Sequence, residues 1–402
     1  MFRWERKVLE WVEKHIYIIA FAGVTILGGV IRMSLRNHVS ADADSSLLPW
    51  YNMIVKGGQI QALKYQVGNY NLLYQFLIVV MTYLPLNPLS AYKLLSCIFD
   101  YLLAGAMGWL VYTMAEKEKV WKFLAAYSMV LLSPLVIANS ATWAQCDSIY
   151  TFWLVLTVLF LLKGKFIRAF VFFGLAMSFK LQAIFLLPFL LLAYFCLRKF
   201  SVLYFAIVPA VMWLSGIPAF LMGRSFRDVF FVYQFQVSDS GKMSYHYPSF
   251  WLLFCSENMD MHRAFSYPYS IYKTAAILLT LCVLAAWMIL WIYRKVEWNG
   301  QNLLYAAFLL TYTTVLLLPA MHERYGFAYE ILAIAIAFRN RKTFPLLAML
   351  TGMSILTYGN FLLARQVDYY GLACINCGVY LAYCHVLGKE MSVSGKEFSN
   401  TF

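Results

Sequence analysis

Long apolar stretches, separated by short clusters of charged residues, run along almost the whole chain. A stretch of about 20 apolar residues spans the bilayer core as a helix, so 402 residues have room for roughly ten to twelve such spans. The pattern therefore predicts an all-α polytopic membrane protein with about twelve transmembrane helices. The apolar segments fall near 16–35, 93–113, 123–140, 149–162, 166–179, 183–197, 201–221, 270–293, 302–320, 326–339, 344–363 and 370–388.

One further apolar run, Leu72–Leu84, has only 13 residues and ends in Pro85 and Pro88. As a helix it would rise about 20 Å, less than the roughly 30 Å of the hydrocarbon core. Several other segments are also short, so length does not decide whether this run crosses the membrane. The distribution of Lys and Arg does.

Cytoplasmic loops collect Lys and Arg, and the rule is strongest for short loops. If the N-terminus is cytoplasmic and Leu72–Leu84 does not cross, 19 of the 32 basic residues face the cytoplasm, nearly all in short loops. If the run crossed, every later basic cluster would face outward. We therefore predict cytoplasmic termini, outer loops near 36–92 and 223–269, and an in-plane or re-entrant helix at Leu72–Leu84. The cytoplasmic residues would be Arg3, Arg6, Lys7, Lys14, Lys117, Lys119, Lys122, Lys163, Lys165, Arg168, Arg198, Lys199, Arg294, Lys295, Arg339, Arg341, Lys342, Lys389 and Lys396.

The composition supports this class and excludes others. The chain is 62% apolar and 13% charged, with a mean hydropathy of +0.67, whereas soluble chains have about 45–50% apolar and about 25% charged residues. The net charge of +13 is explained by the cytoplasmic loops, and no basic soluble segment interleaved with aromatics indicates nucleic-acid binding. The eight cysteines are too few for a disulfide framework, and the Cys374–Cys377 pair lies in an apolar run without a second ligand pair.

Polar residues gather at the predicted outer ends of the spans. The first outer loop carries Asp42 and Asp44, followed by the aromatic pair Trp50 and Tyr51. A carboxylate at this place can act as a general base or hold a cation. The alternative is an ordinary solvated loop.

The outer turn between the third and fourth spans contains Trp143, Gln145 and Asp147 within five residues. An aromatic face contacts the C–H surface of a sugar, while an amide and an acid hydrogen-bond its hydroxyls. The turn is therefore a candidate sugar site. The alternative is an interfacial tryptophan beside a capping aspartate.

Two further groups contain cations. Lys180 and Gln182 occupy the next outer turn, where an ammonium among apolar residues requires an anion, either a lipid headgroup or a substrate phosphate. His322 and Arg324 open the tenth span and have the chemistry to bind a phosphate, although a plain interfacial cluster is the alternative.

Lys93 and Asp100 lie seven residues apart on one helix, and therefore on one face. Charged residues within a span are costly and are functional candidates by default. The two either pair with each other for structural reasons or line the outer cavity.

These stretches resemble the GT-C glycosyltransferases, most closely the bacterial branch related to the second mannosyltransferase of GPI-anchor synthesis. The resemblance covers residues 40–340 approximately and follows the family's order, although this chain has Ala41 where glycine often precedes the acid, and has the additional Asp44. The resembling pieces are Asp42 with Pro49-Trp50-Tyr51, Gly68-Asn69-Tyr70-Asn71, Lys93 to Asp100, Trp143 to Tyr150, Phe179-Lys180-Leu181-Gln182 and His322-Glu323-Arg324-Tyr325.

The resemblance implies a single integral-membrane domain over 1–402, with a GT-C-like catalytic module at 16–340 and two last spans with a tail at 341–402. It implies an inverting transfer of a hexose, with mannose favoured, from a polyprenyl-phosphate donor to a hydroxyl of a glycan or glycolipid acceptor. Asp42 would be the catalytic base. The donor phosphate would be bound by Lys180, Gln182, His322 and Arg324, and the sugar or acceptor by Asp44, Trp50, Tyr51, Asp100, Trp143, Gln145 and Asp147.

We expect no required cofactor and no metal ligand, although a divalent cation is compatible with the carboxylates. The expected location is the bacterial cell membrane, with an extracytoplasmic active site. Two alternatives are a transporter or flippase of lipid-linked sugars and a polysaccharide polymerase or ligase. A transporter favours charges at the midplane and internal repeats, whereas the polar residues of this chain gather at one face.

Overall fold

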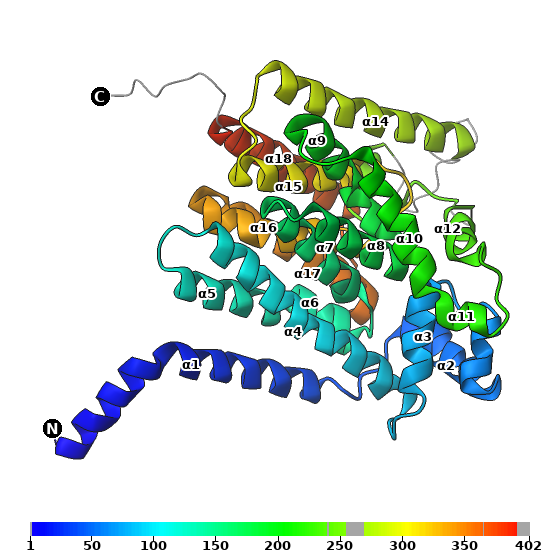
Figure 1. Ribbon diagram of the computed structural model, residues 1–402, viewed down its shortest axis with the longest axis horizontal. Helices are drawn as coiled ribbons and strands as arrows, with labels where there is room; N and C mark the ends of the chain where they lie inside the picture. Colours follow the sequence, from blue (N-terminus) through cyan, green and yellow to red (C-terminus); the bar gives the residue numbers. More distant parts are fainter. Residues whose placement is uncertain (1, 239–240, 255–268, 365, 392–402) are drawn as a thin grey trace.

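The computed structural model describes residues 2–238, 241–254, 269–364 and 366–391. Lys396 of the predicted cytoplasmic tail and part of the predicted second outer loop lie outside these residues. The long helices are arranged roughly side by side, with α1 and α14 at opposite edges of the bundle, and the short helices α2, α3, α11 and α12 gather at one end (Figure 1).

The described chain is almost entirely helical, and short 3-10 or π-helical turns are labelled η. The first half contains α1 (Arg3–Ser34), η1 (Ala43–Leu47), α2 (Leu48–Lys56), η2 (Gln59–Lys64), α3 (Leu72–Met81), α4 (Pro88–Met114), α5 (Lys119–Leu131), α6 (Pro134–Ile137), η3 (Ala138–Thr142), α7 (Asp147–Leu162), α8 (Phe166–Phe179), η4 (Leu181–Leu186) and α9 (Leu187–Leu197). The second half contains η5 (Val202–Ala206), α10 (Ile207–Ser215), α11 (Ile217–Leu221), α12 (Asp228–Ser238), β1 (Ser244–Tyr245), η6 (Phe250–Leu253), α14 (Tyr269–Tyr293), α15 (Gly300–Leu317), β2 (Met321–His322), α16 (Phe327–Arg339), η7 (Arg341–Thr343), α17 (Phe344–Leu363) and α18 (Tyr369–Glu390).

Among the described residues, five helical stretches are long and apolar enough to cross a bilayer: α1, α4, α14, η7 with α17, and α18. A sixth is added if α5 and the bent continuation Pro134–Thr142 count as one span, with 43° between the two parts. The predicted class, an all-α membrane-embedded protein, is confirmed. Several of the other predicted segments form apolar helices of only 10–17 residues, so helix length alone does not establish twelve spans.

Helix α3 covers most of the run that we predicted not to cross. It has 10 residues and begins where the Asn71 side chain accepts a hydrogen bond from the Leu72 N–H. At 1.5 Å per residue it rises about 15 Å, half of the hydrocarbon thickness.

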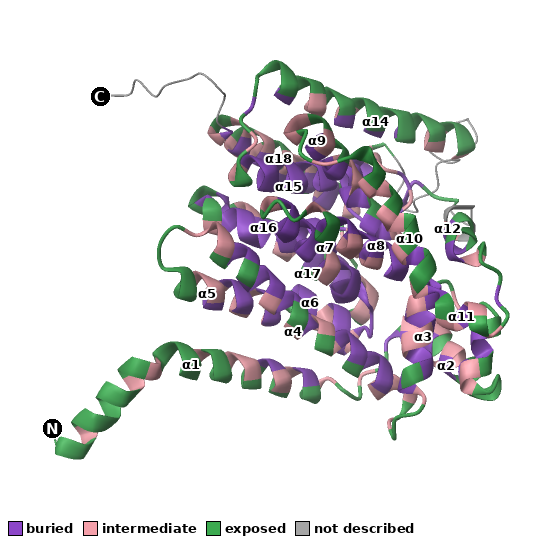
Figure 2. Cartoon of the chain, viewed as in Figure 1, coloured by how far each residue is buried: buried purple, intermediate pink, exposed green. Residues whose placement is uncertain are grey.

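The centre of the bundle is formed by α15 and α16, which are buried along nearly their whole length. In contrast, only Gly28 and Arg32 of α1 are buried, and α1 and α14 expose most of their residues (Figure 2). The exposed residues of α1 include Ile18, Ile26 and Val30. Apolar side chains on the outside of a membrane-embedded bundle face lipid, so the exposure of α1 and α14 needs no further partner.

The break after α5 shapes the functional region. Pro134 has no N–H to continue the preceding helix, and the chain restarts as α6, passes through the π-helical turn η3 and reaches Ala144, whose φ is +63°. A left-handed residue ends the helical path, so α7 begins only at Asp147. The break thereby places Trp143 and Gln145 on irregular backbone and Asp147 at the first position of α7.

A parallel pair of very short strands joins two distant loops. Ser244 pairs with Met321 and Tyr245 with His322, which ties the loop after α12 to the segment before α16. This pairing fixes the backbone that carries His322, Glu323 and Arg324.

Candidate functional site

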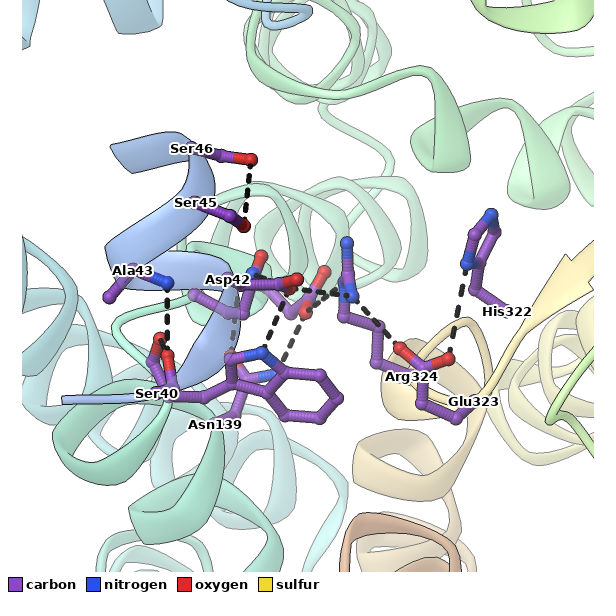
Figure 3. A network of polar contacts seen from close by, with 12 residues as sticks. Ser40, Asp42, Ala43, Ser45, Ser46, Asn139, His322, Glu323 and Arg324 are labelled. Atoms are coloured by element: carbon purple, nitrogen blue, oxygen red, sulfur yellow. Dashed lines mark hydrogen bonds and ion pairs between the residues drawn. The ribbon is translucent and has the colours of Figure 1, made fainter. Parts of the chain in front are cut away.

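The segment after α1, the start of α7 and the segment before α16 meet around Arg324 (Figure 3). Lys180, at the end of α8, joins them through Asp147. Ser40 anchors the segment after α1, because its Oγ donates to the Trp143 carbonyl oxygen over 3.0 Å and accepts from the Ala43 N–H at 3.2 Å. The chain then enters η1, and this turn directs Asp42 toward Arg324 while Asp44 is exposed.

Asp42 is held through one of its two oxygens. Its Oδ2 accepts from Trp143 Nε1 and from Gln145 Nε2, each at 2.9 Å, and lies 3.6 Å from Arg324 Nη1. Gln145 is held in turn, because its Oε1 accepts from the Tyr70 hydroxyl at 3.0 Å. Oδ1 of Asp42 has no hydrogen bond to any described residue, and the side chain is 29% exposed. The free oxygen is the one available to accept a proton.

Asp147 is fully buried at the start of α7, and its carboxylate forms an ion pair with Lys180. Its Oδ1 lies 2.5 Å from Lys180 Nζ, its Oδ2 accepts from Asn139 Nδ2 at 2.7 Å, and Arg324 Nε lies 3.8 Å away. Lys180 occupies the extended residue between α8 and η4, where it has left the helix and is free to turn toward Asp147. The anion that we expected Lys180 to need is therefore supplied by Asp147, 33 residues away.

Arg324 also pairs with its neighbour Glu323, whose Oε1 accepts from Arg324 Nη1 at 2.9 Å. Burial raises the pKa of the Glu323 carboxyl, and the charge of Arg324 opposes this rise. With every group ionised, two cations, Lys180 and Arg324, face three carboxylates, Asp42, Asp147 and Glu323. An anionic substrate therefore meets cations that are already paired.

His322 lies beside this cluster as a neutral imidazole. Burial lowers the pKa of His322 below its usual range, and the charges of Arg324 and Lys180 lower it further. Its ring lies flat on Tyr245, with centroids 4.6 Å apart and planes 7° from parallel. His322 can therefore offer a ligand a hydrogen bond but no positive charge.

A cavity of about 650 Å³ adjoins the cluster. The four residues that we predicted to bind the donor phosphate, Lys180, Gln182, His322 and Arg324, all line it, together with Tyr70 and Tyr325. The structure thus gathers that set from two segments more than 130 residues apart in the chain.

The seven predicted sugar or acceptor residues do not line this cavity. Trp143 is fully buried, its ring stacked 4.5 Å from Phe361 and covered by the Arg324 guanidinium at 5.4 Å. A fully buried ring has no face open to a sugar, so this arrangement contradicts that role for Trp143. Trp143 and Gln145 instead hold Asp42, and Asp147 holds Lys180.

Asp100 belongs to a separate buried network. It is fully buried and accepts from Arg32 Nε at 2.8 Å and from the hydroxyls of Ser140 and Ser148 at 2.5 Å each. Lys93 donates instead to the carbonyl oxygens of Leu35 and His38. The expectation that Lys93 and Asp100 pair, or that Asp100 reaches the ligand, is therefore wrong for this arrangement.

The remaining aromatic candidates have packing roles. Trp50 covers Gly68, where an added Cβ would meet the indole at 2.7 Å and where φ is +72°. Only glycine suits that backbone conformation and that close approach. Tyr51 is 5% exposed and packs edge-on against Tyr92 with ring centroids 6.2 Å apart.

Sequence reasoning missed Arg32, which neutralises Asp100. Its signal was available, because a single cation within the apolar segment 16–35 is costly unless it has a partner. Glu323 was also missed as a member of the cluster, although it lies between two residues that we had selected. Its signal was weak, because a carboxylate next to an arginine is also common on ordinary surfaces.

No protein-family model and no curated protein matches this chain. Among the described residues, no group of three or more His, Cys, Asp and Glu side chains is placed to hold a metal ion.

Proposed function

We propose that the chain is an inverting glycosyltransferase of the GT-C type, which transfers a hexose, with mannose favoured, from a polyprenyl-phosphate donor to an acceptor hydroxyl outside the cytoplasm. One observation carries the proposal. Asp42 has one oxygen fixed by two N–H donors and one oxygen free, and it lies 3.6 Å from an arginine that lines a cavity together with Lys180. A base and two cations at one site fit the displacement of a phosphate by a hydroxyl.

In this mechanism the donor phosphate binds in the cavity against Lys180 and Arg324. Asp42 Oδ1 accepts the proton of the acceptor hydroxyl as its oxygen forms a bond to the anomeric carbon. The bond from that carbon to the phosphate oxygen breaks, and the polyprenyl phosphate leaves with the electron pair. The single displacement inverts the anomeric centre. Arg324 and Lys180 stabilise the charge that develops on the leaving phosphate.

We propose a bacterial cell-membrane location with about twelve spans, and with the site on the extracytoplasmic side. Single cysteines in place of the exposed residues Asp44 and Asn69, and of Lys117 and Lys199 as opposite-side controls, test this topology in a background without native cysteines. An impermeant thiol reagent on intact cells should label positions 44 and 69 only. Labelling of positions 117 and 199 instead would contradict it.

The activity is tested by incubating the purified chain and a membrane extract with polyprenyl-phosphate mannose, glucose, galactose and N-acetylhexosamine, each radiolabelled in the sugar. The expected result is transfer of one sugar to an acceptor and release of polyprenyl phosphate, lost in Asp42→Asn. Movement of intact donor across liposomes without cleavage would instead indicate a flippase. Cleavage of none of these donors would contradict the proposal.

A further inference from the structure

The cavity has two chemically different walls. The first wall contains the two cations Lys180 and Arg324. A second set of lining residues, which we call the second wall, comes from residues 66–69 and from α12, and it consists mainly of neutral amides with one carboxylate and one aromatic ring. Its members are Gln66, Asn69, Asp228, Phe231 and Gln236.

The second wall has a cation, but that cation is fully engaged. Arg224 is 5% exposed, and its Nε lies 2.8 Å from Asp228 Oδ2. Its Nη1 donates to the Tyr65 carbonyl oxygen at 2.8 Å and to Gln75 Oε1 at 3.1 Å, and its Nη2 donates to Gln66 Oε1. The charges of Arg224 and Asp228 cancel. Every guanidinium nitrogen of Arg224 is hydrogen-bonded, whereas Arg324 Nε has no hydrogen-bond partner among the described residues. The second wall is therefore better suited to a neutral ligand than to a phosphate.

Phe231 provides an apolar surface within this polar wall. It is 44% exposed and lines the cavity, whereas its neighbour Phe230 is 47% exposed and does not. The Asn69 side chain has no hydrogen bond to any described residue, and Asp228 is 37% exposed with only Oδ2 engaged by Arg224. Hydroxyl groups are recognised by such amides and carboxylates, and the C–H face of a pyranose packs on an aromatic ring.

We infer that the wall formed by Asn69, Asp228 and Phe231 is the acceptor subsite and that it binds a neutral sugar. This inference rests on the proposed transferase function and deepens it, because it assigns the acceptor sugar to named residues of the same cavity. The subsite is distinct from the residues that the sequence indicated for sugar binding, since those hold the base and the lysine.

The first experiment measures binding without any donor. The full-length chain in detergent is titrated with fluorescently labelled neutral di- and trisaccharides of mannose, glucose and galactose. At least one should bind. Phe231→Ala should weaken that binding by about three- to tenfold, the value of one aromatic contact, whereas the matched control Phe230→Ala should not. Phe231→Trp should preserve saccharide binding. Thermal unfolding of each variant shows whether weaker binding comes from loss of the aromatic contact with the sugar or from misfolding.

A second variant removes a proposed polar contact with the sugar and leaves the ion pair of Arg224 and Asp228 in place. Asn69→Ala should raise the acceptor KM in the transfer assay while the donor KM stays unchanged. The subsite is contradicted if no neutral saccharide binds, or if Phe230→Ala and Phe231→Ala have equal effects.

The two proposals fail in different ways. Saccharide binding that depends on Phe231, together with no cleavage of any polyprenyl-phosphate sugar, would contradict the transferase and leave the sugar subsite standing. Sugar transfer with an unchanged acceptor KM in both Phe231→Ala and Asn69→Ala would leave the transferase standing and contradict the subsite.

Discussion

The indole N–H of Trp143 donates a hydrogen bond to Oδ2 of Asp42 over 2.9 Å, although the two residues are 101 positions apart. The indole is fully buried and contacts both Phe361 and Arg324, so its own position is fixed by packing. A buried group that points one N–H at a partly exposed carboxylate determines which oxygen remains available. We interpret Trp143 as a positioning residue for the proposed base.

Removing the indole N–H of Trp143 should therefore lower the catalytic rate more than it weakens substrate binding. Trp143→Phe keeps an aromatic ring and removes the N–H, and a hydrogen bond to a charged group is worth about 1.5–3 kcal/mol. We expect kcat to fall by about 10- to 100-fold with donor KM nearly unchanged. Gln145→Leu removes the other N–H group that donates to Asp42 Oδ2 and should have a similar effect. Equal losses in kcat and in donor affinity would argue for a direct contact with the donor.

The two acids that follow α1, Asp42 and Asp44, should differ sharply. Asp42→Asn keeps the size of the side chain and removes its basicity, so transfer should fall by about 10²–10⁴-fold. Asp44 is exposed, so Asp44→Asn should cost a few-fold at most. Single-turnover transfer measures both, and donor binding should survive in both. If Asp44→Asn is inactive and Asp42→Asn active, the base is Asp44.

Variants of the ion pair between Lys180 and Asp147 should distinguish an effect on stability from an effect on binding of the polyprenyl-phosphate donor. Lys180→Met leaves the buried Asp147 carboxylate without its cation, which should destabilise the chain by about 3–5 kcal/mol. The double variant Lys180→Met/Asp147→Asn should recover most of the unfolding temperature in detergent. It should not recover affinity for polyprenyl phosphate, if Lys180 binds that group. Recovery of both would show that Lys180 only supports the fold.

Glu323 should make donor binding depend on pH. The charged groups that face it are Arg324 on its own segment and Asp42 and Asp147 from other elements, and the neutral imidazole of His322 is adjacent. A protonated Glu323 removes one negative charge and frees Arg324 for the phosphate. Because burial raises the pKa of Glu323, donor affinity should be highest below that raised pKa and should fall as the pH rises through it.

Glu323→Gln tests this prediction, since the amide cannot ionise. The variant should hold the donor with about tenfold higher affinity at high pH and should show a flatter dependence of donor Kd on pH. If Glu323→Gln shows the same dependence of donor Kd on pH as the parent chain, another titratable group causes that dependence.

Asp100 should matter for folding rather than for catalysis. Its carboxylate is fully buried against Arg32, Ser140 and Ser148, which join α1, η3 and α7 to α4. Asp100→Ala should lower stability by about 3–5 kcal/mol, because it leaves the Arg32 charge buried without a partner. Arg32→Met/Asp100→Leu should be more stable than either single variant. Thermal unfolding measures the loss of stability. The acceptor KM of the folded fraction should be unchanged.

The sequence by itself determined the class of this protein, because composition and apolar run length depend only on residue identity. It also selected the turns that meet at Arg324, since a charged residue at the end of an apolar segment stands out without any knowledge of packing. Lys180 and Arg324 stand out in this way, with Gln182 and His322 beside them, and all four line one cavity.

Only the tertiary structure decided which of these groups touch one another. Asp147 neutralises Lys180 across 33 positions, and Arg32 neutralises Asp100 across 68, because helix packing places these side chains in contact. The roles of Trp143 and of Phe231 depended on burial, which residue type does not reveal: the indole is enclosed and the phenyl ring is open to the cavity. Contacts between distant segments and the exposure of single rings are properties of the packed chain, and local sequence patterns do not encode them.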